Sequence, residues 1–94
     1  MTREQNRQKM FDYMLHKGAD RFWANVALKH IMLNFAGNNH WLTDIKNPKI
    51  KVVEFGMVDR FSIDCKINTE SETVSGKLIY KHGKAKHHVQ VKSA

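Results

Sequence analysis

The chain has 94 residues, and hydrophobic residues occupy 41% of its positions, which fits one globular domain and excludes a disordered chain. Lysine and arginine total 16 against 9 aspartate and glutamate residues, a formal net charge of +7, and residues 77–94 hold five lysines and three histidines but no acidic side chain. Such a charge is typical of a solubilising surface or of a protein that binds a polyanion.

The first part of the chain predicts two helices. Residues 1–19 are expected to form an N-terminal helix, because Thr2 and Gln5 have capping-box spacing and Gly18 suits its end. Residues 20–37 are expected to form a second helix with Asp20 as its N-cap. Apolar residues on more than one face of this helix predict partners on two sides.

From residue 40 onward the apolar pattern has a period of two, which predicts strands over residues 40–92. The clearest example is residues 60–67, where Phe61, Ile63 and Cys65 alternate with polar side chains. Gly56 lies beside a change of phase that indicates a bulge or a bend at a barrel corner.

Four further segments have strand-like patterns: residues 40–46, 49–58, 77–81 and 87–92. Residues 68–76 are polar and are expected to form a hairpin loop. Short, closely spaced strands favour a closed barrel, which hides its edges. The predicted fold is therefore mostly β, a small five-stranded antiparallel barrel preceded by two α-helices, in a single domain of residues 1–94.

Three local motifs resemble those of one known family. The segment "LIYKH", residues 78–82, is similar to the Tyr-Lys-His signature of Hfq, the bacterial Sm-like RNA chaperone. Asp59-Arg60-Phe61 resembles the Asp-x-Phe segment of that family, and Asn47-Pro48 falls where the family has Asn-Gly. The resemblance covers residues 26–91 and implies an Sm-like barrel in a homo-oligomeric ring. Residues 1–19 have no counterpart in the minimal family pattern, and Asp44 stands where the family uses an aromatic residue to bind A-rich RNA.

The resemblance also implies a site for single-stranded, U-rich RNA and a role as an RNA chaperone or post-transcriptional regulator. In the family, the residue matching Phe61 stacks on a base, and those matching Lys81 and His82 contact the base edge and the backbone. The residue matching Tyr80 bonds across the subunit boundary. The neighbouring Lys84 and Lys86 complete the expected RNA-binding set.

Other interpretations of the same residues stay open. Phe61 shares a strand face with Ile63 and Cys65, so the residue pattern alone favours a core position. A basic protein-interaction module, with the two helices as its docking surface, is the alternative function, and duplex DNA binding is a third.

We expect neither an enzyme nor a metal or cofactor site. His87 and His88 are adjacent on a strand and point to opposite faces, and no nucleophile motif or phosphate loop is present. Cys65 is the one cysteine, which fits a reducing compartment. With a polar N-terminus and no apolar run of membrane-spanning length, a cytoplasmic protein is expected.

Overall fold

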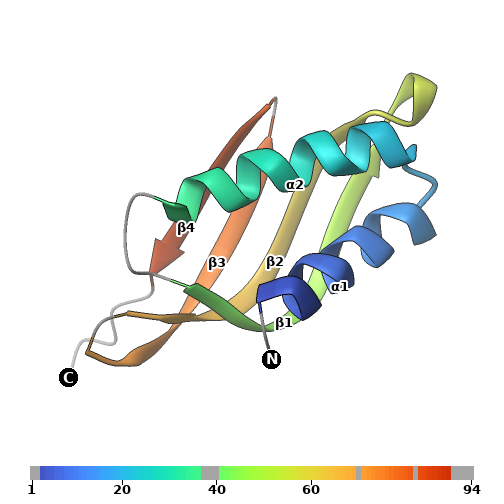
Figure 1. The fold of residues 1–94 in the computed structure, drawn as a ribbon. Coiled ribbons are helices and arrows are strands. Elements are labelled where there is room, and N and C mark those ends of the chain that lie inside the picture. Colours follow the sequence, from blue (N-terminus) through green and yellow to red (C-terminus); the bar gives the residue numbers. More distant parts are fainter. Residues whose placement is uncertain (1–2, 37–40, 70, 82, 90–94) are drawn as a thin grey trace.

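The computed structural model describes residues 3–36, 41–69, 71–81 and 83–89. Two helices are followed by four strands (Figure 1). In chain order the elements are α1 (Arg3–His16), α2 (Arg21–Ala36), β1 (Trp41–Val52), the short 3-10 helix η1 (Glu54–Gly56), β2 (Val58–Asn68), β3 (Thr73–Lys81) and β4 (Lys84–Val89). Among the described residues, neither helix combines the length and the hydropathy needed to cross a membrane.

Local signals at residues 18 and 20 separate the two helices. Gly18 takes a left-handed φ of 94°, and its N–H donates to the carbonyl of Leu15 at 3.0 Å, which closes α1. The carboxylate of Asp20 then accepts the N–H of Phe22 at 2.9 Å and caps the start of α2. The two predicted helices are thus confirmed, while the expected cap at Thr2 lies outside the described residues.

The strands form one antiparallel sheet in the order β1-β2-β3-β4. The predicted five-stranded closed barrel, and with it the Sm-like fold, is therefore wrong: in the described chain the sheet has four strands and is open, with β1 and β4 at its edges. Both helices pack against one face of this sheet, as Figure 1 shows. The protein is a small two-layer α+β domain.

One reason for the difference is β1, which joins two segments that were predicted as separate strands. It runs through Asn47-Pro48, where a break was expected. Asp44 and Asn47 take left-handed φ values of 49° and 54°, and the pairing with β2 shifts register beside each of them. These bulges absorb the irregular residues without ending the strand. Pro48 lacks an N–H donor, which an edge strand tolerates.

The bend expected near Gly56 is present, but it connects two neighbouring strands of an open sheet. β1 ends at Val52, η1 intervenes, and β2 begins at Val58. A second difference lies in residues 68–76, which were predicted to be a loop. Most of this segment belongs to strands, since β2 continues to Asn68 and β3 begins at Thr73. The connecting turn is closed by paired hydrogen bonds between Thr69 and Glu72.

Helix α1 also covers the edge of the sheet formed by β1 through side-chain hydrogen bonds. From α1, the amide of Asn6 donates to the carbonyl of Leu42 at 3.0 Å, and Nζ of Lys9 donates to the carbonyl of Ile45 at 3.1 Å. Leu42 and Ile45 lie on the edge strand β1, whose backbone would otherwise offer unpaired acceptors. These hydrogen bonds satisfy two backbone carbonyls of an edge strand, which a closed barrel would not have.

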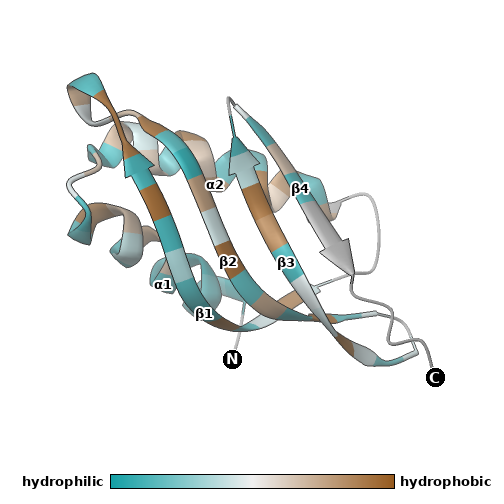
Figure 2. Cartoon of the chain, turned by 180° about the vertical axis from the view of Figure 1, so that it is seen from behind, coloured by the Kyte–Doolittle hydropathy of each residue, from teal (hydrophilic) through white to brown (hydrophobic). Residues whose placement is uncertain are grey.

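The core lies between the helices and the sheet. Alternation along β2 directs Phe61, Ile63, Cys65 and Ile67 toward the helices, and Leu78 and Tyr80 of β3 join them. The helices contribute the following buried residues: Met10, Met14, Ala24, Ala27, Leu28, Ile31 and Phe35. Neither α1 nor α2 lies on the opposite face of the sheet, and Figure 2 views the molecule from that side.

Candidate nucleic-acid interface

A row of four basic side chains crosses the sheet face that the helices leave uncovered. The strand register places Lys51 opposite Arg60, Arg60 opposite Lys81, and Lys81 opposite Lys84, so each strand contributes one cation. Residues directly opposite in an antiparallel sheet share a face. Arg60 precedes the buried Phe61 and therefore points away from the helices. All four side chains are exposed. We call Lys51, Arg60, Lys81 and Lys84 the cation row.

The same face carries further cations beside the cation row. In the next register position Lys49 of β1 and Lys86 of β4 flank the half-buried Ser62 and Ile79. One position further, Lys46 and Lys77 flank Asp64. We call this surface, on the side of the sheet opposite the helices, the open face.

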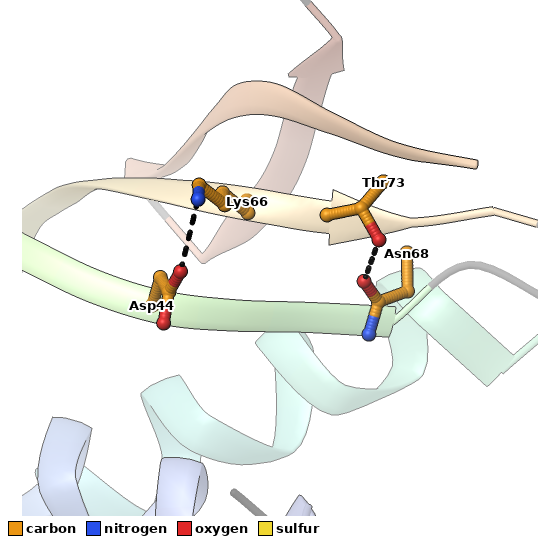
Figure 3. A network of polar contacts seen from close by, with 4 residues as sticks. All are labelled: Asp44, Lys66, Asn68 and Thr73. Carbon is orange, nitrogen blue, oxygen red and sulfur yellow. Dashed lines mark hydrogen bonds and ion pairs between the residues drawn. The ribbon is translucent and has the colours of Figure 1, made fainter.

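Two acidic side chains on or near the open face, Asp44 and Asp64, are engaged with neighbours. Asp44 pairs with Nζ of Lys66 at 3.3 Å (Figure 3). Asp64 is half-buried and accepts a hydrogen bond from the amide of Asn47 at 3.0 Å. Asp64 lies two register positions from the cation row, and the pair of Asp44 and Lys66 lies further along, toward the end of the hairpin where Thr73 donates to Asn68 (Figure 3). The positive charge is thus concentrated at the opposite end of the face.

The cation row is electrostatically unfavourable for the isolated fold. Adjacent strands lie about 4.8 Å apart, so neighbouring members of the row hold like charges at short range, and directly opposed like charges destabilise a sheet. A bound polyanion would neutralise this repulsion and release counterions from its phosphates. The arrangement is therefore suited to a phosphate backbone that crosses the strands.

The predicted site residues divide between the two sides of the sheet. Lys81, Lys84 and Lys86 share the open face. Their role in binding RNA stays a prediction. His82 lies outside the described residues. Phe61 is 0% exposed and belongs to the core, so within this chain its ring offers no surface on which a base could stack.

Tyr80 also lies on the helix-covered side. It is buried, its ring centroid is 6.1 Å from that of His30 on α2, and burial raises the pKa of its hydroxyl. α2 of the same chain therefore covers much of the ring that the resemblance assigned to a subunit boundary.

The structure adds basic residues that the sequence interpretation passed over. Lys46, Lys49 and Lys51 come from β1, and Arg60 comes from β2, all well before the basic C-terminal segment. Lys49 and Lys51 flank the apolar Ile50 in the sequence, but this alternation places them on a shared face of their own strand only. Joining them to Lys81 and Lys84 required the strand register.

A second overlooked feature is the loop of residues 53–57, which connects β1 to β2. Phe55 in this loop is 86% exposed, and its φ of 63° and ψ of 18° are left-handed. This conformation costs a side-chain-bearing residue on the order of 1–3 kcal/mol. The sequence signal was an aromatic residue directly before a glycine at a phase change.

Neither metal binding nor thiol chemistry finds a site in the described part of the chain. No three of its His, Cys, Asp and Glu residues gather where they could hold a metal ion. Burial, with a smaller effect of the Asp64 charge, raises the pKa of the Cys65 thiol to about 11. This thiol is neutral near pH 7 and is a poor nucleophile.

Comparisons with known proteins add no relative to this description. No family model matches the chain, and neither the curated proteins nor the solved structures contain a significant match. The open face and the loop beside it are therefore the features of the molecule that indicate a function.

Proposed function

We propose that this protein binds single-stranded RNA on the open face of its sheet. The observation that supports the proposal is the cation row, in which Lys51, Arg60, Lys81 and Lys84 align across four strands without an acidic side chain among them. Regularly spaced cations on the face of a sheet suit a phosphate backbone, whose neutralisation drives binding.

The shape of the surface favours a single strand over a duplex. Proteins that read the major groove of duplex DNA insert a helix or a two-stranded ribbon. Here the cations lie on the face of a four-stranded sheet, which is too broad to enter a groove. Sheet faces of this kind bind splayed single strands in other RNA-binding domains. The choice of a U-rich strand rests on the resemblance of residues 78–82 to the Hfq signature.

The proposal is tested by removing charge from one side of the molecule at a time. In the double variant Lys81→Gln/Lys84→Gln two members of the cation row become neutral. The matched control is Lys17→Gln/Lys29→Gln, which removes the same charge from exposed positions on the helical side. Affinity for a labelled U-rich oligonucleotide is measured over a series of salt concentrations for both variants and for the wild type.

The open-face variant should bind more weakly, and its log–log salt slope should become shallower by about 0.7 for each phosphate that the protein no longer neutralises. The control should keep the wild-type slope. Equal weakening in both variants would mean that only net charge matters, and the site proposed here would be wrong. A matching DNA oligonucleotide shows whether the 2′-hydroxyl contributes.

The alternative function, a protein-interaction module, is favoured by a different observation. Phe22 and Leu33 on α2 are 62% and 59% exposed, away from the sheet. Under this alternative, the RNA affinities of the two double variants would not differ, whereas Phe22→Ser/Leu33→Ser would abolish association with a protein partner.

A further inference from the structure

The exposed ring of Phe55 is an unusual feature of the described surface. Among the large hydrophobic side chains it is the most exposed, at 86%, compared with 62% for Phe22 and 59% for Leu33. Val53 and Met57 of the same loop are each 37% exposed, so the ring stands beside further apolar surface. Such a ring contributes little to the core, and its exposure needs another reason.

The backbone of the 53–57 loop holds this ring in a defined position. The N–H of Val53 donates to the carbonyl of Met57 at 2.9 Å, and the N–H of Gly56 donates to the carbonyl of Val53 at 3.2 Å. Asp20, at the start of α2, donates its N–H to the carbonyl of Gly56 at 3.0 Å. These bonds tie the loop to itself and to the helical layer, so Phe55 is presented in an ordered loop.

The contact between loop and helix is close. A Cβ added to Gly56 would lie 2.6 Å from the backbone nitrogen of Asp20, so this approach requires glycine. Phe55 is left with a left-handed backbone that glycine or asparagine would adopt more readily. A strained residue that is also exposed is characteristic of a binding site, because neither packing nor backbone preference accounts for it.

The loop lies at the end of the sheet where the cation row crosses. Lys51 is four residues before Phe55 and Arg60 is five residues after it, and these two form the pair in the cation row next to the loop. A chain of four residues reaches at most about 14 Å. The ring and the row are therefore close enough to contact one short stretch of nucleic acid.

The chemistry of the loop suits a base more than a phosphate. The exposed carboxylate of Glu54 precedes Phe55 and would repel a phosphate, whereas an aromatic ring stacks on the face of any base. The described residues of the cation row and of the adjacent register position include no aromatic side chain. Phe55 supplies a stacking surface beside the cation row.

We propose that Phe55 stacks on an unpaired base of the strand whose phosphates lie along the cation row. This inference rests on the proposed function and adds the residue that selects single-stranded over paired nucleic acid. In a duplex the faces of the bases are already stacked on their neighbours, so the ring would have access only to an unpaired base or a terminal pair.

The test compares Phe55→Ala with Phe55→Trp and with Leu33→Ala, an exposed apolar residue on the other side of the molecule. Affinity for a U-rich single strand is measured against salt concentration, and thermal melting is recorded for each variant. Phe55→Ala should weaken binding by about 5- to 150-fold, the range expected for one stacked base. Phe55→Trp, which keeps an aromatic ring, should bind about as tightly as the wild type, and so should Leu33→Ala.

Two further readouts separate stacking from a structural effect. Stacking releases no counterions, so Phe55→Ala should keep the wild-type salt slope while its affinity falls, and its melting temperature should not fall. A long RNA duplex, in which terminal pairs are a small fraction of the binding sites, should be bound equally by the wild type and by Phe55→Ala. A weaker affinity of the alanine variant for the duplex, to the same degree, would overturn the assignment to an unpaired base.

The outcomes also separate this inference from the proposed function. If Phe55→Ala binds the single strand as the wild type does while Lys81→Gln/Lys84→Gln binds weakly, the stacking role is wrong and the proposed function stands. If the lysine variant binds as the wild type does, the proposed function fails at its own site and the inference fails with it.

Discussion

At the scale of single residues, Phe61 and Phe55 differ sharply in burial. Phe61 lies in a motif that resembles a base-stacking segment, yet its ring is fully buried among Ile63, Leu78 and the helices. Phe55 has no such motif, yet it is 86% exposed. Burial rather than motif decides which ring is accessible to a ligand.

Phe61→Ala should therefore act on folding. Truncating a buried phenylalanine costs roughly 3–5 kcal/mol, a large part of the 5–15 kcal/mol typical of a whole domain. Chemical denaturation of Phe61→Ala and of Phe55→Ala should show a large loss only for the first. Phe61→Leu, which keeps most of the volume, should retain both stability and RNA binding. Weak RNA binding by a stably folded leucine variant would instead assign Phe61 to the site.

Cys65 predicts a pH dependence of stability. Burial raises its pKa from 9.0 to about 11 in the folded chain, so the unfolded chain loses the thiol proton first. The neutral thiol makes its full contribution to the free energy of unfolding below pH 9. This contribution, about 2–3 kcal/mol, is lost as the pH rises from about 9 to 11. Between pH 9 and 11, the free energy of unfolding, measured by denaturant titration at each pH, should fall less steeply with pH for Cys65→Ala than for the wild type. Parallel curves would contradict the assignment.

At the scale of elements, the contact between the 53–57 loop and α2 determines how the sheet end is held. Gly18 and Gly56 both have left-handed φ values, 94° and 73°, but only Gly56 faces a close neighbour, Asp20. The two glycines therefore separate the cost of backbone conformation from the cost of steric overlap.

Gly18→Ala should cost about 1–2 kcal/mol, since an L-residue is strained in this conformation. Gly56→Ala adds the overlap with Asp20 and should cost about 1–3 kcal/mol more. Free energies of unfolding from denaturant titration of both variants provide the comparison. Equal destabilisation would show that the loop moves away from α2 without penalty.

At the scale of the whole molecule, the positive charge belongs to a face and not to a segment. Residues 77–94 hold five lysines and no acidic side chain in the sequence. The sheet, however, brings Lys49 and Lys51 of β1 onto the same surface as Lys81 of β3 and Lys84 of β4. All four strands form this surface, because each strand places one side chain at each register position.

Lys49→Gln/Lys51→Gln should accordingly weaken binding to a U-rich strand about as much as Lys81→Gln/Lys84→Gln. The salt slope should fall by about 0.7 for each phosphate left without a cation. Titrations at several salt concentrations, with Lys17→Gln/Lys29→Gln as the charge-matched control, measure this effect. Wild-type binding by the β1 variant would restrict the site to the C-terminal strands.

Assembly into a homo-oligomer stays a prediction, although the barrel that suggested a ring is wrong. The expectation now rests on the small size of the domain and on an exposed apolar side chain, Phe22. Light scattering at micromolar concentration should give several times 11.0 kDa. A monomer at that concentration would remove the expectation.

Much of the local structure could be predicted from the sequence. Gly18 and Asp20 act within one or two residues of their own positions, so they mark the helix ends without reference to the rest of the chain. The period-two pattern of residues 60–67 likewise predicts a strand with one buried face, and it placed Phe61 in the core when considered without the motif.

The tertiary structure decided what depends on pairing between distant segments. Whether the sheet closes depends on which strands pair, and the bulges at Asp44 and Asn47 let one long strand form where two were expected. Register between strands then determines which cations share a face. Local sequence determines the direction of a side chain within its own strand, whereas its neighbours across the sheet follow from long-range packing against α1 and α2.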